Sequence, residues 1–159
     1  MIRVAALPAL FLLALISFLS VTHAYSDLDN PNLRQLNSEN FDQLTKEKAW
    51  LVEFFSPQCP HCQAFAPTWK DLSVISEHLE DSSHFFMARV DCIAQGDLCE
   101  AQGIQGYPQM NLYKDGKKAE TYHGSRGFKT LRAYINQQAE AYRLEKATPP
   151  AAAAEPKGL

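Results

Sequence analysis

The stretch "WLVEFFSPQCPHCQAFAPTW", residues 50–69, joins an apolar run to two cysteines three positions apart. The run over 49–55 is apolar on both alternating faces except at Glu53, which is typical of a strand buried inside a parallel sheet. From Cys62 onward, apolar residues recur at steps of three and four, which predicts a helix. Pro60 fits the first helical position, where its missing N–H is not needed. The stretch therefore predicts a strand, a short turn and a helix that begins at the cysteines.

Strand and helix signals alternate along the chain. In order, they are a short strand and a first helix within 32–44, the strand over 49–55, the helix from the cysteine pair, a strand over 84–92, a short helix around 98–102, two strands joined at Asp115 and Gly116, and a last helix. The apolar stripe of the long middle helix is expected to comprise Cys62, Phe65, Trp69, Leu72, Ile75 or Ser76, and Leu79, with a bend at Pro67. That of the last helix is expected to comprise Phe128, Leu131, Tyr134 or Ile135, Gln138 and Tyr142. This order predicts an α/β fold, a sheet with helices on both faces.

Residues 1–24 have the pattern of a cleavable secretory signal, with Arg3, an apolar run, and small residues at Thr22 and Ala24. An uncleaved membrane anchor is the alternative, but Pro8 interrupts the run and no basic cluster follows it. We expect cleavage after Ala24 and export to the endoplasmic reticulum lumen or out of the cell, with no membrane attachment afterwards.

Charge and composition narrow the remaining possibilities. The formal net charge is −3 with both signs mixed along the chain, so neither nucleic acid nor an anionic membrane is an expected partner. Residues 25–145 suit one domain with a hydrophobic core. Residues 146–159 lose periodicity and are rich in Ala and Pro, which predicts a disordered tail. The chain ends in "PKGL", which is not an endoplasmic reticulum retrieval tetrapeptide.

The cysteine pair Cys59 and Cys62 admits three interpretations: a metal site, a redox-active pair or a structural disulfide. Cys59 is expected at the start of the helix, where free N–H groups and the helix dipole favour the reactive thiolate. Cys62 lies one turn later on the same face, close enough for a disulfide. It also begins the apolar stripe, so we expect it to be the more buried of the two.

The zinc interpretation would take Cys92 and Cys99 as the other ligands. Their C-x6-C spacing differs from the C-x2-C of the first pair, and an exported chain gives its thiols little protection from oxidation. A purely structural bridge between Cys59 and Cys62 would close a very short loop and stabilise the fold poorly. We therefore favour the redox pair.

Four stretches together resemble the thioredoxin-fold catalytic domain of the protein disulfide isomerase family: the opening stretch, "RVDC", "GIQGYPQMNLYKDG" and "YHGSRGFKTLRAYI". The resemblance runs from about Leu28 to Glu145. It implies that Cys59 is the attacking thiol and Cys62 the resolving thiol. It also implies that Pro108 is a cis-proline whose loop faces the active disulfide and holds the client backbone.

The resemblance implies supporting roles for two charged residues. An isolated buried carboxylate needs a partner or a raised pKa, and the family analogy makes Glu53 the proton acceptor for Cys62, with Arg89 as its partner. A purely structural pair of Glu53 and Arg89 is the alternative. Arg126 matches an arginine that swings towards the resolving sulfur and lowers its pKa; the alternative is an exposed loop cation.

The chain also departs from the family pattern. Pro60 replaces the usual glycine and, with His61, forms the intervening pair of a strongly oxidising bacterial relative. Gln58 stands where an aromatic residue is usual, and Gln109 replaces the threonine after the cis-proline. A protonated His61 beside Cys59 is expected to stabilise the thiolate and make the disulfide a better oxidant.

Cys92 and Cys99 flank the end of a strand and the start of a helix. Some family members have a second cysteine pair in this place. A structural disulfide is the interpretation that we favour, with a second redox centre as the alternative.

We therefore expect a secretory-pathway thiol–disulfide oxidoreductase with one thioredoxin-fold domain, no cofactor and no metal. Its expected partners are client proteins with thiols or disulfides, and an upstream oxidase or glutathione. A chaperone-like binding module, whose thiols lock a client with slow turnover, is the alternative. The predicted site residues are Cys59, Cys62, His61, Pro60, Glu53, Arg126 and Pro108.

Overall fold

The structure is a computed structural model that describes residues 33–148. Its elements are β1 (Arg34–Gln35), α2 (Phe41–Thr45), β2 (Ala49–Phe55), α3 (Pro60–Ile75), α4 (His78–Ser83), β3 (Phe85–Asp91), α5 (Gly96–Ala101), β4 (Gln109–Lys114), β5 (Lys117–Tyr122) and α6 (Phe128–Ala147). The signal predicted for residues 1–24 lies outside the described residues, as does the predicted tail beyond residue 148. In the described part, no helix has both the length and the apolar character needed to span a membrane.

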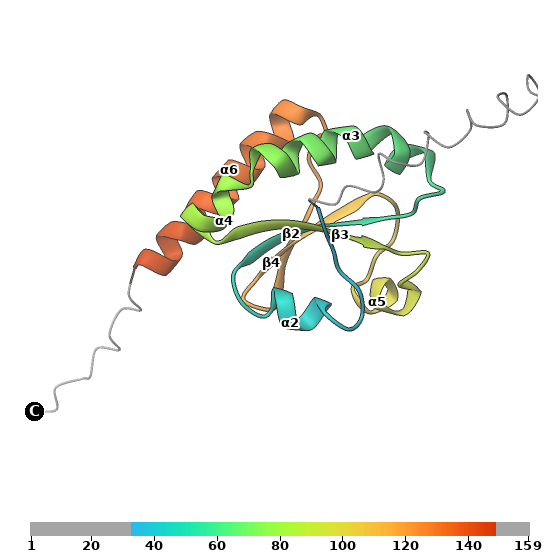
Figure 1. Cartoon of the computed structure of the whole chain (residues 1–159), viewed down its shortest axis with the longest axis horizontal. Helices are drawn as coiled ribbons and strands as arrows, with labels where there is room; N and C mark the ends of the chain where they lie inside the picture. The colour runs from blue at the N-terminus through green and yellow to red at the C-terminus, as the bar shows by residue number, and fades with distance from the viewer. Residues whose placement is uncertain (1–32, 149–159) are drawn as a thin grey trace, which may run out of the picture. The chain divides into compact units, whose positions relative to one another are not determined.

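The strands form one mixed sheet in the order β1-β3-β2-β4-β5. β2 is the central strand, because it pairs in parallel with β3 and antiparallel with β4. Helices α3, α4 and α6 cover one face of the sheet, and α2 and α5 cover the other (Figure 1). The predicted α/β fold, with helices on both faces, is therefore confirmed.

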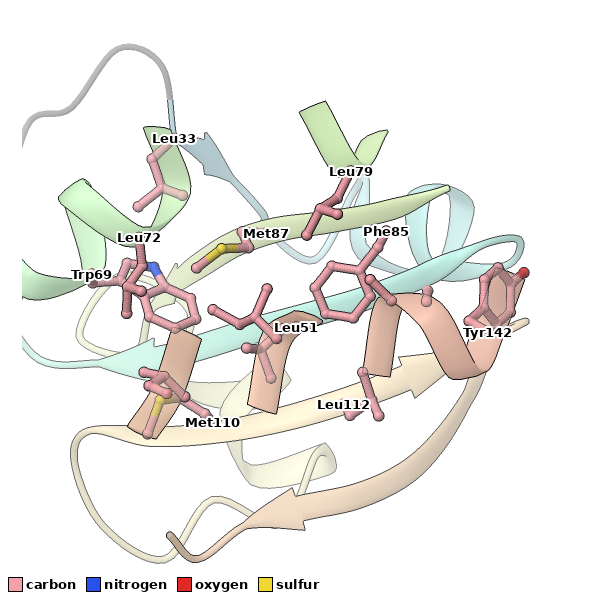
Figure 2. Close-up of a cluster of buried hydrophobic side chains, with 14 of the residues drawn as sticks. Leu33, Leu51, Trp69, Leu72, Leu79, Phe85, Met87, Met110, Leu112 and Tyr142 are labelled. Carbon is pink, nitrogen blue, oxygen red and sulfur yellow. The ribbon is translucent and has the colours of Figure 1, made fainter. Parts of the chain in front are cut away.

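Each face of the sheet carries its own hydrophobic cluster. All seven residues of β2 are buried, with Leu51 in one cluster and Val52 in the other. Figure 2 shows the cluster under α3 and α6, where Trp69 and Leu72 pack over the sheet beside Met110 of β4. Burial of each such large side chain contributes roughly 1.5–3 kcal/mol. These contacts fix α3, and with it the cysteines at its start.

The long middle helix departs from the prediction because it is two helices. α3 ends at Ile75, the N–H of Ser76 caps it by donating to the carbonyl of Leu72, and α4 then begins at His78. Ser76 is buried and Ile75 is exposed, so the stripe passes through Ser76. Leu79 remains buried because α4 packs on the same face of the sheet.

The other predicted elements need smaller changes. The helix α3 continues through Pro67. In α6 the buried positions are Leu131, Ile135, Ala139 and Tyr142. Ala139 therefore takes the core position predicted for Gln138. The helix ends at Ala147, two residues past the predicted domain boundary at residue 145.

The hairpin between β4 and β5 turns at Asp115 and Gly116, as predicted. Both residues have positive φ, 49° and 79°, which is the conformation of a tight two-residue hairpin turn. A side chain at Gly116 would also meet the backbone of Lys46 at 3.4 Å. The turn is tied to α6, because Tyr142 Oη donates to Asp115 Oδ1 at 2.7 Å.

Candidate active site

The two thiols of the site lie at the junction of β2 and α3. Cys59 is the N-cap of α3 and has extended backbone angles, and Pro60 follows at the first helical position. The N–H of Cys59 donates to the carbonyl of Ser56 at 3.1 Å, and the N–H of Gln63 donates to the carbonyl of Cys59 at 3.0 Å. Both cysteines are thiols in this structure. The local sequence thus places the first thiol at the helix N-terminus, as predicted.

Cys59 is partly exposed and has a pKa below the ordinary thiol value. The main cause is the backbone N–H of Cys62, which points at the Cys59 sulfur from the first turn of α3. Burial opposes this effect and is the next largest influence, while the Cys62 thiol, the backbone N–H of His61 and the charge of Arg126 lower the pKa further. Cys59 is therefore the more nucleophilic of the two thiols at neutral pH.

Cys62 behaves in the opposite way. Its side chain is fully buried, and this burial raises the pKa of its thiol to about 12, with further contributions from the Cys59 thiol and the charge of Glu53. A backbone N–H of Ser56 opposes the rise. Cys62 therefore needs a nearby base before it can act as a nucleophile.

Glu53 is the one carboxyl on the central strand β2. It is 3% exposed, and burial raises the pKa of its carboxyl to about 8, while the charge of Arg89 opposes the rise. Glu53 and Arg89 are register partners in the β2–β3 pairing. The carboxylate acts electrostatically on Cys62, so a carboxyl with a near-neutral pKa lies within electrostatic reach of the Cys62 thiol.

Arg89 is buried and contacts two side chains, Gln35 and Phe55. Gln35 of β1 pairs with it in register. With the amide turned so that its oxygen faces the guanidinium, Gln35 accepts from Arg89 Nη2 at 2.7 Å. The guanidinium also lies over the ring of Phe55, 5.0 Å from its centroid. Glu53 is its register partner on the α3 face of the sheet, and the guanidinium charge there lowers the pKa of the carboxyl.

The loop before β4 faces Cys59. The Tyr107–Pro108 peptide bond is cis, as the resemblance implies, and the Cys59 thiol donates to the carbonyl of Tyr107 at 3.7 Å. Arg126 Nη2 donates to the carbonyl of Pro108 at 3.0 Å. A groove of about 240 Å³ runs along this loop, lined by Gly106, Tyr107, Pro108, Gln109, Thr121, Tyr122, His123 and Arg126.

Two further predicted site residues, Arg126 and His61, act on Cys59. Arg126 is held at the Pro108 carbonyl, and its charge lowers the pKa of Cys59. A movement of Arg126 towards Cys62 stays a prediction. His61 is exposed, and it acts on Cys59 through its backbone N–H. The effect of its imidazole on the redox poise stays a prediction.

Cys92 and Cys99 form a disulfide with an S–S distance of 2.01 Å. Both are buried, and the N–H of Cys92 donates to the carbonyl of Phe55 at 2.8 Å. The bridge uses two of the four thiols that the zinc interpretation needs. Among residues 33–148, no three His, Cys, Asp or Glu side chains gather in a way that could hold a metal ion.

Sequence reasoning missed the backbone groups of the site. The carbonyl of Tyr107 and the N–H of Ser56 act on the two thiols, yet the side chains at these positions carry no signal of it. The position of Tyr107 before Pro108 is the only hint.

The comparisons with known proteins agree with this geometry. The family model described as Thioredoxin matches residues 32–137. The chain is 36% identical to a thioredoxin domain-containing protein 5 homolog of Drosophila melanogaster, over 65% of this chain and 25% of that protein. It is 35% identical to a putative protein disulfide-isomerase of Schizosaccharomyces pombe, over 65% and 20%.

A solved structure gives the same result. The J-Trx1 fragment of ERdj5 matches with a TM-score of 0.64 and 29% identity, over 70% of this chain and 54% of that one. The chain spans about a quarter or less of the length of the two curated relatives from Drosophila melanogaster and Schizosaccharomyces pombe.

Proposed function

Because the chain belongs to the thioredoxin family and has protein disulfide isomerases among its relatives, we propose that it is a thiol–disulfide oxidoreductase of the secretory pathway. Its CPHC dithiol would form, reduce or rearrange disulfides in client proteins. The observation that carries the proposal is the opposite pKa shift of Cys59 and Cys62 within one turn of α3. Cys59 can therefore attack as a thiolate, while Cys62 keeps its proton until a base removes it.

In the reductive direction, the Cys59 thiolate attacks one sulfur of a client disulfide. The client S–S bond breaks, a Cys59–client disulfide forms, and the other client sulfur leaves as a thiolate. Cys62 then gives its proton to Glu53 and attacks Cys59 Sγ. The mixed disulfide breaks, the second client sulfur leaves, and the Cys59–Cys62 disulfide forms. Two electrons have passed from the enzyme dithiol to the client.

The reverse sequence oxidises a client dithiol, and it needs a supply of enzyme disulfide. A glutathione disulfide pool or an upstream oxidase would provide it by the same exchange chemistry. Relatives described as protein disulfide isomerases support exchange chemistry on the disulfides of proteins. The Cys92–Cys99 disulfide supports an oxidising setting, because such bridges persist in oxidising compartments.

The groove along the Tyr107–Pro108 loop is the expected place for the client backbone. It adjoins Cys59 through the Tyr107 carbonyl, which already contacts the thiol. Arg126 contributes to the same wall and lowers the pKa of Cys59. A client sulfur placed at Cys59 would therefore meet a thiolate whose surroundings are already ordered.

Turnover tests the proposal. The protein is mixed with an excess of a peptide disulfide in a glutathione buffer, and peptide reduction is followed over many equivalents. We expect catalysis that Cys59→Ser abolishes, and a trapped enzyme–peptide disulfide with Cys62→Ser. Capture of one equivalent of peptide without turnover would replace the enzyme with a redox-locked binding module.

A further inference from the structure

A chain of hydrogen bonds with one direction runs behind the Tyr107–Pro108 loop. The N–H of Gln105 donates to Gln109 Oε1 at 3.2 Å, and Gln109 Nε2 donates to Asn111 Oδ1 at 3.1 Å. Asn111 Nδ2 then donates to Tyr113 Oη at 3.3 Å, and Tyr113 Oη donates to Gln102 Oε1 at 2.8 Å. The series of hydrogen bonds starts at Gln105 and ends at Gln102. Together with the backbone of residues 102–105, which leads to Tyr107, it therefore forms a closed ring.

Asn111 is the central member of this ring. Its side chain is fully buried in β4, and its Oδ1 also accepts from Thr121 Oγ1 of β5 at 2.9 Å. Gln109 and Thr121 both line the groove beside Cys59. One buried oxygen therefore orients two side chains of the groove wall, while lying outside the groove lining itself.

The direction of the hydrogen bonds fixes the amide of Asn111. Oδ1 uses its two lone pairs for Gln109 and Thr121, and Nδ2 serves Tyr113. Burial raises the pKa of Tyr113 to about 12, so its hydroxyl keeps the proton that it donates to Gln102. Buried chains of this kind strengthen one another and rigidify what they connect. An apolar residue in place of Asn111 would leave Gln109 and Thr121 without that acceptor.

We propose that Asn111 is a positioning residue for the client groove, which acts through Gln109 and Thr121 to hold the 102–109 segment in the form that accepts a peptide. The proposal rests on the proposed function, because it assigns the groove to client peptides. It separates two properties of the site. The reactivity of Cys59 comes from the start of α3 and Arg126, whereas acceptance of a peptide depends on Asn111.

The test compares two disulfides in Asn111→Leu, a nearly isosteric change. One is a peptide disulfide of about ten residues, and the other is dithiodipyridine, which has no peptide backbone. We expect kcat/KM for the peptide to fall about tenfold through a higher KM, as expected for the loss of one to two hydrogen bonds. The rate with dithiodipyridine and the alkylation profile of Cys59 should stay within about twofold of wild type.

Thr45→Val is the matched control. Thr45 is also buried and its hydroxyl donates to the carbonyl of Phe41 at 2.8 Å, but this bond does not join the ring. The variant should lose stability without changing the ratio of peptide to dithiodipyridine rates. An equal loss on both disulfides in Asn111→Leu, or an unchanged peptide KM, would overturn the proposal and leave Asn111 with a role in stability only.

Tyr113→Phe supplies a second variant if Asn111→Leu does not fold. It removes the hydroxyl that accepts from Asn111 and donates to Gln102, and it keeps the aromatic side chain. We expect a peptide KM about two- to threefold higher, with an unchanged dithiodipyridine rate. A peptide KM in Tyr113→Phe equal to that of wild type would overturn the proposal. Wild-type turnover of the peptide tests the proposed function separately, because the inference concerns only the ratio of variant to wild type.

Discussion

Glu53 and Arg89 lie opposite each other in the parallel pairing of β2 and β3, and both side chains are buried at 3% exposure. Despite the neighbouring guanidinium, burial keeps the pKa of Glu53 at about 8. The loss of solvation therefore outweighs the attraction of Arg89. The carboxyl is held in an unfavourable environment on the strand that leads to the two cysteines, and this placement supports two predictions.

The first concerns stability against pH. In the unfolded chain Glu53 loses its proton near pH 4.5, whereas the folded chain keeps it until about pH 8. The folded state thus binds more protons in this window, so stability falls as pH rises through it. Glu53→Gln should remove this slope and raise the free energy of unfolding at pH 9 by on the order of 5 kcal/mol relative to wild type. Denaturant unfolding of both proteins from pH 4 to 9 measures it; parallel curves would contradict the raised pKa.

The second concerns the proton of Cys62. Glu53→Gln keeps the shape of the side chain but removes the proton acceptor. Resolution of a preformed Cys59–peptide disulfide should slow by about a hundredfold. In wild type the rate should rise as pH approaches 8, because the active base is the ionised carboxylate. Single-turnover release of the peptide against pH measures both effects, and wild-type kinetics in the variant would leave Glu53 with a structural role.

Much of this site was predictable because its chemistry follows from short-range patterns. The placement of Cys59 at a helix start follows from Pro60 and the apolar strand before it, and the burial of Cys62 follows from the stripe that it begins. Helix ends were less predictable. Ser76 and His78 mark a break that the spacing of apolar residues does not reveal, because α4 resumes the same stripe.

Long-range polar contacts could not be predicted from the sequence alone. The place of Arg126 at the Pro108 carbonyl depends on how the segment after β5 meets the loop before β4. The ring through Asn111 depends on a pairing of β4 with β5 that brings Thr121 opposite it. No local spacing encodes either contact.

The third prediction concerns the reactivity of Cys59. Alkylation of the reduced protein against pH should show one thiol that reacts with a midpoint below the ordinary value of about 8.5. Arg126→Gln removes a favourable charge, so alkylation at pH 7 should slow by about two- to fivefold. Arg132→Gln, a change at an exposed position of α6, is the control and should leave the profile unchanged. A single midpoint near 8.5 for all reactive thiols would refute the assignment.

The fourth concerns the Cys92–Cys99 disulfide. After mild reduction with glutathione, mass spectrometry should find this pair still bridged while Cys59 and Cys62 are thiols, because structural disulfides have the lower reduction potential. Replacing both Cys92 and Cys99 with alanine should lower the free energy of unfolding by roughly 2.5 kcal/mol, the chain-entropy value for so short a loop. Reduction of both pairs at the same glutathione concentration would instead indicate two redox centres.

The last prediction concerns the redox poise. His61 is exposed beside Cys59, and its backbone N–H already favours the thiolate. A protonated imidazole would add to this effect, and it would do so only in the reduced enzyme, because a disulfide carries no charge to stabilise. The reduced form gains, so the disulfide becomes a better oxidant. A gain of about 1–2 kcal/mol corresponds to roughly 20 to 45 mV.

His61→Thr keeps the backbone N–H and removes the imidazole. Its Cys59 pKa should rise and its potential, measured against a glutathione buffer, should become more reducing by that amount. An unchanged potential would assign the poise to the backbone of α3 alone.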